Sequence, residues 1–202
     1  MKMFLSTLLL LSGLTFASGA CSPADEPLRT EKPAPDPDPD PQPTEGRALV
    51  VYFSCTNTTK GIADRIVEAT GAAAWRIVPE VAYSAADLNY NDASSRANRE
   101  QSDPEARPAI QGKCDALADC NVVFLGYPIW WGKAPKVIFT FLESHDLAGK
   151  TIVTFCTSGS SGIGSSDTDL HRLASGASWK QGRRFSGSES QETVAGWIES
   201  MK

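Results

Sequence analysis

Two short loops carry the residues of this chain that are best suited to hold a ligand. The first loop follows an apolar run at residues 49–53 and offers hydroxyl and amide groups from Ser54, Thr56, Asn57, Thr58 and Thr59. The second loop follows another apolar run and contains Pro128, Ile129, Trp130, Trp131 and Gly132. Hydroxyls and backbone N–H groups at a helix N-terminus bind a phosphate without a cation, and indole rings cover a flat ring system. The two loops therefore predict a phosphorylated aromatic cofactor at the carboxyl ends of neighbouring parallel strands, where open α/β sheets bind ligands.

The cofactor that fits this description is FMN, and the loops resemble those of the flavodoxin family. The stretch LVVYFSCTNTTKGIA (residues 49–63) resembles the family's first strand, phosphate loop and first helix, in which the loop usually reads S/T-x-T-G-N-T. The stretch GYPIWWGKAPKVIFTFLE (residues 126–143) is similar to the flavin-flanking loop and the helix after it. A third stretch, FCTSGSSGIGS (residues 155–165), resembles the loop at the other flavin edge, which implies contacts from Thr157, Ser158, Gly159, Ser160 and Gly164. The three stretches occur in the family's order, so the resemblance covers residues 47–202 and implies FMN.

Side-chain types within these loops add three expectations. Asn57 stands where the family usually has glycine, and because asparagine tolerates a positive φ better than most residues, the turn is expected to survive. Adjacent residues point in different directions, so we expect Trp130 to lie on the flavin and Trp131 to pack inward. Residues 157–164 contain no aromatic side chain, which leaves one flavin face open to a substrate.

The periodicity of residues 47–202 predicts one α/β domain. Apolar runs predict strands at residues 49–53, 74–78, 122–125, 152–155 and 179–185. Helical patterns predict helices at residues 59–70, 112–118, 135–144, 166–175 and 190–201. Strands that alternate with helices pair in parallel through right-handed crossovers. We therefore expect a doubly wound five-stranded parallel sheet in the flavodoxin-like order 2-1-3-4-5, with the two ligand loops at its switch point.

Residues 79–110 fit no single element. The segment contains Tyr83, Tyr90 and three arginines, so one interpretation is a lid that folds over the flavin edge. The other interpretation is a surface excursion with a little helix.

Charge is distributed unevenly along the chain. Seven of the 24 acidic and three of the 19 basic residues precede Arg47, which leaves 17 acidic and 16 basic residues in residues 47–202. A net charge of −1 argues against a nucleic-acid partner, which requires a basic face. It also weakens the interpretation as a soluble electron shuttle, because such proteins use a one-signed surface for steering.

The first 46 residues comprise a predicted targeting signal and a predicted tether. Residues 1–21 have the form of a secretory signal whose end, Ser18-Gly19-Ala20-Cys21, resembles a bacterial lipoprotein processing site. This predicts an exported lipoprotein that is anchored to a membrane through lipid on Cys21 and faces the periplasm or the cell exterior. An ordinary signal cut near Ala20 is the alternative. Residues 22–46 alternate proline with aspartate and other residues, which predicts an extended, disordered tether.

The remaining cysteines and the histidines give little support for other chemistries. Cys55 and Cys156 lie at the ends of two strands that are separated by a third strand. They are therefore expected about 9 to 10 Å apart, beyond the ~7 Å Cα–Cα limit for a disulfide. Pairing of Cys114 with Cys120 stays open, because it requires the intervening helix to unwind. His145 and His171 follow no nucleophile motif, and no cluster has metal-ligand spacing. Hydrolase and metalloenzyme functions are therefore disfavoured.

Two functions from different classes follow from these patterns. The first is an FMN-dependent reductase that passes electrons to a quinone or another small acceptor. The second is a non-enzymatic carrier that exchanges single electrons with redox-protein partners. A flavin-binding module without turnover is a third possibility, and the sequence assigns no catalytic residue.

Overall fold

The computed structural model describes residues 47–201. The predicted signal, Cys21, the tether at residues 22–46 and the final residue lie outside the described residues, so the expectations for them remain predictions. In the described part of the chain, no helix is long and apolar enough to cross a membrane.

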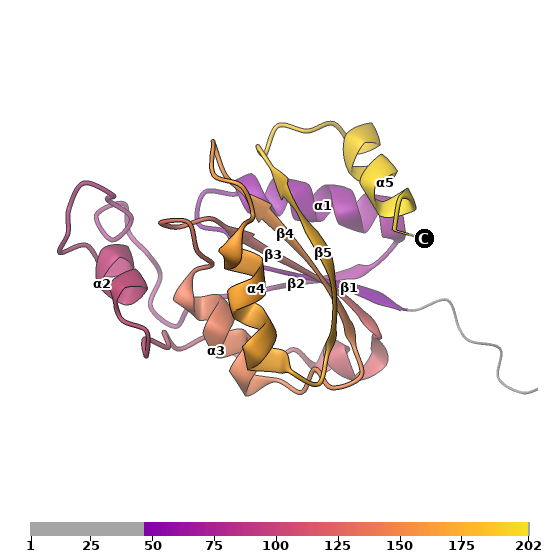
Figure 1. Cartoon of the computed structure of the whole chain (residues 1–202), viewed down its shortest axis with the longest axis horizontal. Coiled ribbons are helices and arrows are strands. Elements are labelled where there is room, and N and C mark those ends of the chain that lie inside the picture. Colours follow the sequence, from indigo (N-terminus) through magenta and orange to yellow (C-terminus); the bar gives the residue numbers. More distant parts are fainter. Residues whose placement is uncertain (1–46, 202) are drawn as a thin grey trace, which may run out of the picture. The chain divides into compact units, whose positions relative to one another are not determined.

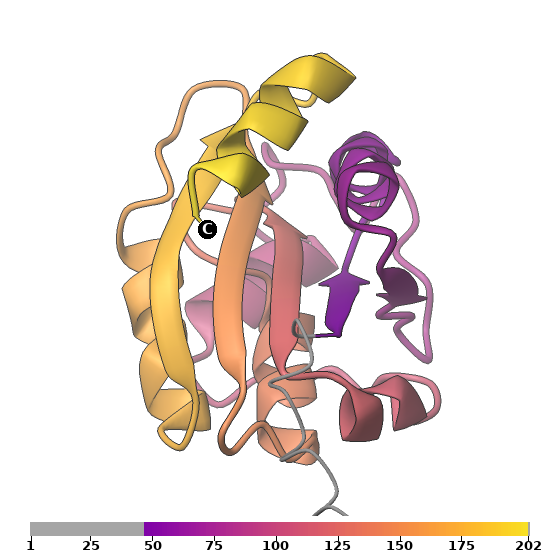
Figure 2. The same cartoon turned by 90° about the vertical axis from the view of Figure 1, so that its right-hand side faces the viewer.

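Five parallel strands form the sheet, in the order β2-β1-β3-β4-β5 (Figures 1 and 2). The strands are β1 (Ala48–Tyr52), β2 (Ala73–Arg76), β3 (Val122–Pro128), β4 (Thr151–Thr157) and β5 (Ser178–Phe185). The predicted fold class and strand order are thus confirmed. β3 separates β1 from β4, as the argument against a Cys55–Cys156 disulfide requires.

Helices cover both faces of the sheet because side chains alternate between faces along each strand. Val50 and Tyr52 of β1 belong to the core under α1 (Thr58–Thr70) and α5 (Gln191–Glu199). Leu49 and Val51 belong to the opposite core, under α3 (Lys136–Ser144) and α4 (Ser165–His171). Figure 1 shows α1 and α5 on one side of the strands and α3 and α4 on the other. A sheet buried on both faces leaves its carboxyl end as the edge where a ligand can bind.

Some elements differ from the sequence prediction. The helix predicted at residues 112–118 is a 3-10 helix, η1 (Asp115–Asp119). Gly112 has a φ of 70°, outside the right-handed helical region, so the helix begins only at Asp115. The helix predicted at residues 166–175 stops at His171 and continues as the 3-10 turn η2 (Arg172–Ala174).

A short helix, α2 (Arg96–Ser102), forms within the segment 79–110, for which the sequence pattern predicted no helix bounds. Its N-cap is Ser95, whose hydroxyl accepts a hydrogen bond from the Asn98 N–H at 3.4 Å. An Arg96–Glu100 ion pair of 2.6 Å spans one helical turn and supports the short helix. Ser95 was the sequence signal that could have revealed α2.

Among residues 47–201, all four cysteines are free thiols, which resolves the open question of Cys114 and Cys120. His145 caps the end of α3, where its Nε2 accepts a hydrogen bond from the Cys114 N–H at 3.1 Å. His171 lies in α4 and stacks on Trp179 at 4.4 Å between ring centroids. The described residues contain no group of three His, Cys, Asp or Glu side chains that could hold a metal ion.

Candidate functional site

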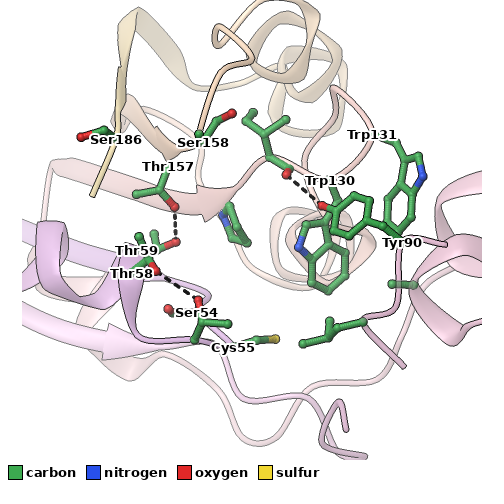
Figure 3. Close-up of a pocket in the computed structure, with 16 residues that line it drawn as sticks. Ser54, Cys55, Thr58, Thr59, Tyr90, Trp130, Trp131, Thr157, Ser158 and Ser186 are labelled. Atoms are coloured by element: carbon green, nitrogen blue, oxygen red, sulfur yellow. Dashed lines mark hydrogen bonds between the residues drawn. The ribbon is translucent and has the colours of Figure 1, made fainter. Parts of the chain in front are cut away.

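A pocket of about 330 Å³ lies at the carboxyl ends of β1, β3 and β4 (Figure 3). Eleven of the predicted site residues line it: Ser54, Thr56, Thr58, Thr59, Pro128, Ile129, Trp130, Trp131, Thr157, Ser158 and Gly159. The long strands β3 and β4 explain why the second and third loops meet here. They pair as far as Pro128 and Thr157, so both loops leave the sheet at the same level.

Four predicted residues do not line the pocket. Asn57, Gly132 and Gly164 take positive φ values of 64°, 75° and 43°, so their contribution is to turn the backbone. Ser160 lies further along the exposed loop after β4, beyond Gly159. The expected survival of the Asn57 turn is confirmed, because Asn57 adopts the left-handed conformation directly before α1.

The first wall of the pocket is the N-terminus of α1. The first hydrogen bond at this end of the helix runs from Gly61 N–H to the Asn57 carbonyl at 2.9 Å. The N–H groups of Thr58, Thr59 and Lys60 precede that bond and have no acceptor four residues back in the helix. Hydroxyls gather at the same place, and those of Thr56 and Thr58 are 3.1 Å apart. This wall presents neutral hydrogen-bond donors and the positive end of a helix dipole.

A buried hydrogen bond joins the first wall to the loop after β4. The hydroxyls of Thr59 and Thr157 are 2.8 Å apart and bridge α1 and β4 (Figure 3). The Ser158 N–H donates to the Phe185 carbonyl at 3.0 Å, which fixes the start of this loop against β5. Two loops that are about one hundred residues apart in sequence are therefore held as one surface.

The second wall is a two-residue turn that carries the tryptophans. Trp130 and Lys133 exchange two backbone hydrogen bonds of 2.9 Å, and the residues between them, Trp131 and Gly132, both have positive φ. This is the backbone of a tight hairpin turn, in which asparagine or glycine is usual. Trp131, at φ 49°, holds a bulky side chain in a conformation that costs free energy, and such strain concentrates at functional sites.

The turn changes the expected orientation of Trp131. Trp131 was expected to pack inward, yet 37% of it is exposed, and it stacks on Tyr90 with centroids 4.1 Å apart. Trp130 is only 5% exposed and makes edge contacts with Phe53 and Tyr83. The positive φ at Trp131 directs its side chain outward. The rule that adjacent side chains point in different directions does not predict this. Both indoles still line the pocket (Figure 3).

The segment 79–110 forms the rim beside this turn. Leu88, Tyr90 and Ala97 line the pocket, and none of them was a predicted site residue. The Tyr90 hydroxyl donates to the Ile129 carbonyl at 3.3 Å, and the Gln101 side-chain amide donates to the Trp130 carbonyl at 2.9 Å. The segment thus contains the short helix of one interpretation and places three residues at the edge of the pocket, as the other interpretation expects.

Two further lining residues were missed, Cys55 and Ser186. Burial raises the pKa of the Cys55 thiol to about 11, so the thiol stays protonated at neutral pH and is a poor nucleophile. Ser186 comes from the loop between β5 and α5, next to Gly187. A side chain at Gly187 would meet the Thr58 methyl at 2.2 Å, so glycine is needed for this loop to reach the first wall.

No described residue that lines the pocket carries a charge. Lys60, beside the first wall, pairs with Asp64 at 2.6 Å. The pocket is thus a neutral cradle of hydroxyls and N–H groups on one side and aromatic rings on the other. Such a surface suits an anionic group joined to a planar ring.

A family model described as Flavodoxin matches residues 47–201. The chain belongs to the flavodoxin family. A candidate flavoprotein from Bacteroides eggerthii is 41% identical in sequence, with a TM-score of 0.73 over 77% of this chain and 97% of that one. A second, from Bacteroides uniformis, is 43% identical, with a TM-score of 0.73 over 76% and 98% of the two chains.

A more distant flavodoxin-like fold comes from Lactobacillus acidophilus. This flavoprotein, solved in complex with FMN, is 20% identical and has a TM-score of 0.57 over 69% of this chain and 93% of that one. No curated protein sequence matches the chain. The flavodoxin-family fold and the pocket at its switch point therefore agree with the architecture expected from the sequence.

Proposed function

We propose that this flavodoxin-family domain binds FMN in the pocket at the carboxyl ends of its strands. The observation that carries the proposal is the division of the pocket into a hydroxyl-rich helix N-terminus and an aromatic wall. Ser54, Thr56, Thr58 and Thr59 would hold the phosphate, together with the free N–H groups of α1. No carboxylate lines the pocket to repel a phosphate, and FMN is the ligand bound by the Lactobacillus acidophilus flavoprotein.

Bound FMN supplies one-electron or two-electron redox chemistry, and the protein contributes binding, access and electrostatics. On one side, the pocket is lined by Trp130 and by the stacked rings of Tyr90 and Trp131. On the other side, Ser158 and Gly159 are small and leave room beside a ring. We propose that a small planar acceptor, such as a quinone, enters on this side and is reduced there.

The alternative is a one-electron carrier for redox-protein partners. Tyr90 and Trp131 are 52% and 37% exposed at the rim of the pocket, and such aromatic rings are common at protein interfaces. The domain is nearly neutral, however, and lacks the one-signed charge that steers such encounters. The reductase is therefore the function we favour.

A bulky residue on the open side separates the two functions. In Ser158→Trp, reoxidation of the dithionite-reduced protein by a soluble quinone should slow at least about tenfold, equivalent to ~1.4 kcal/mol of activation free energy. FMN affinity and reoxidation by a cytochrome should change little. Ser160→Trp is the matched control, because Ser160 does not line the pocket. An unchanged quinone rate in a well-folded Ser158→Trp protein would contradict reduction on this side and favour the carrier.

We further propose that the mature protein is held at a bacterial membrane by lipid on Cys21 and faces away from the cytoplasm. The signal-like start, the Ser18-Gly19-Ala20-Cys21 end and the proline-rich residues 22–46 support this proposal. Several acyl chains on one residue give stable anchoring where one chain does so only marginally.

Replacement of the proposed anchor gives a direct test of this placement. Cys21→Ala should move the protein from the membrane fraction to the soluble fraction after a salt wash, while FMN binding stays the same. Cys55→Ala, which removes a thiol inside the domain, should leave the protein on the membrane. A mature N-terminus at a residue other than Cys21, found by mass spectrometry, would contradict lipid attachment there.

A further inference from the structure

Arg184 places a positive charge directly behind the wall of the pocket. It lies near the carboxyl end of β5, opposite Cys156 of β4 in the sheet register. Its Nη2 donates a hydrogen bond to the Ser158 carbonyl, and Ser158 lines the pocket. The guanidinium is therefore one hydrogen bond away from the backbone that faces the ligand.

Among residues 47–201, this charge has no partner of opposite sign. None of the ion pairs formed by residues 47–201 includes Arg184. Asp167, which packs behind β4, instead accepts a hydrogen bond from Thr154 at 2.7 Å and lies 3.6 Å from His171. The Nε of Arg184 is buried and also lacks a hydrogen-bond partner. A buried donor without an acceptor lowers stability, so packing alone does not explain an arginine at this position.

The hydrogen bond to Ser158 also carries the influence of the charge toward the pocket. The peptide group that accepts it contains the Gly159 N–H, and Gly159 lines the pocket. Donation to a carbonyl polarises its peptide group and strengthens the N–H on the same group as a donor. Because the lining contains no charged residue, nothing in it offsets this field.

We infer that Arg184 is a positioning residue that favours the reduced form of the bound cofactor over the oxidised form. The inference rests on the proposed FMN binding. Reduction adds electron density to the cofactor ring, and a fixed cation behind the pocket wall stabilises added negative charge more than a neutral ring. The charge thus raises the affinity for reduced FMN relative to oxidised FMN.

The test is the ratio of the dissociation constants of oxidised and reduced FMN, measured on the full chain under anaerobic conditions. In Arg184→Gln, which keeps a donor but removes the charge, the affinity for reduced FMN should fall about tenfold more than that for oxidised FMN. For a two-electron couple, this fold-change is equivalent to a potential about 30 mV lower. Arg184→Lys keeps the charge, so its ratio of dissociation constants should stay close to that of the unsubstituted protein. Arg184→Met preserves the aliphatic stem and replaces the glutamine variant if that protein does not fold.

Arg183→Gln is the matched control, because it removes the same charge one residue away. The Arg183 guanidinium lies 5.1 Å from the centre of the Phe185 ring, on the α5 side of the strand, so its removal should leave the ratio unchanged. Equal losses of affinity for oxidised and reduced FMN in Arg184→Gln would overturn the inference, because Arg184 would then only support the loop. A failure of the unsubstituted protein to bind FMN would overturn the proposed function as well.

Discussion

Replacement of Thr56 and Thr58 by valine should weaken FMN binding by about 2 kcal/mol, or roughly thirtyfold in dissociation constant. Their hydroxyls lie 3.1 Å apart at the N-terminus of α1, where we place the phosphate. Valine keeps the branched shape of threonine but cannot donate a hydrogen bond to a charged oxygen. Titration of the apoprotein, followed by flavin fluorescence, measures the change.

Riboflavin, which lacks the phosphate, is the internal control for this double variant. Its weaker binding should change little, since the hydroxyls act on the phosphate alone. Thr70→Val makes the same substitution at the other end of α1, where the hydroxyl bonds to the Ile66 carbonyl, and should leave FMN affinity intact. Equal losses for FMN and riboflavin in the double variant would place the phosphate elsewhere.

A second large effect is expected from Gly126→Ala, which should lower the free energy of unfolding by about 3 kcal/mol. A Cβ at this position would lie 2.1 Å from Cζ of Phe155, far inside contact distance. Phe155 is fully buried in the core under α1 and α5, so any displacement of its ring disturbs its neighbours. The change can be measured by urea unfolding of the apoprotein.

Gly196→Ala adds the same methyl group in the opposite situation. Gly196 lies in α5, and a Cβ there would meet nothing within 4 Å. Since alanine favours a helix more than glycine, this variant should gain about 0.5 to 1 kcal/mol of stability. Loss of stability in Gly196→Ala, or none in Gly126→Ala, would contradict the packing described for the sheet.

The sheet and the first wall of the site could be predicted because their signals are local. Apolar runs that alternate with helical patterns are sufficient to predict parallel strands. Asn57, in a loop before a helix, predicts a left-handed turn, and the structure contains that turn at φ 64°. The hydroxyls between residues 54 and 59 are adjacent in sequence, so the helix start alone brings them together.

The rest of the site depends on contacts between distant residues. Tyr90 reaches the pocket because it stacks on Trp131, 41 positions later, and no local pattern links them. The outward direction of Trp131 follows from a positive φ that its residue type disfavours. Ser186 joins the pocket only because Gly187 lets the last loop approach Thr58. Such features depend on how the strands and loops are arranged in three dimensions, and no single residue type predicts that arrangement.

The central claim is that the pocket is built for a phosphorylated flavin. The most direct measurement is a paired titration of the purified, flavin-free protein with FMN and with riboflavin under the same conditions. We predict that FMN binds at least about a hundredfold more tightly, the equivalent of ~2.7 kcal/mol contributed by the phosphate. Equal affinities for the two flavins would contradict the assignment of the α1 N-terminus as the phosphate site.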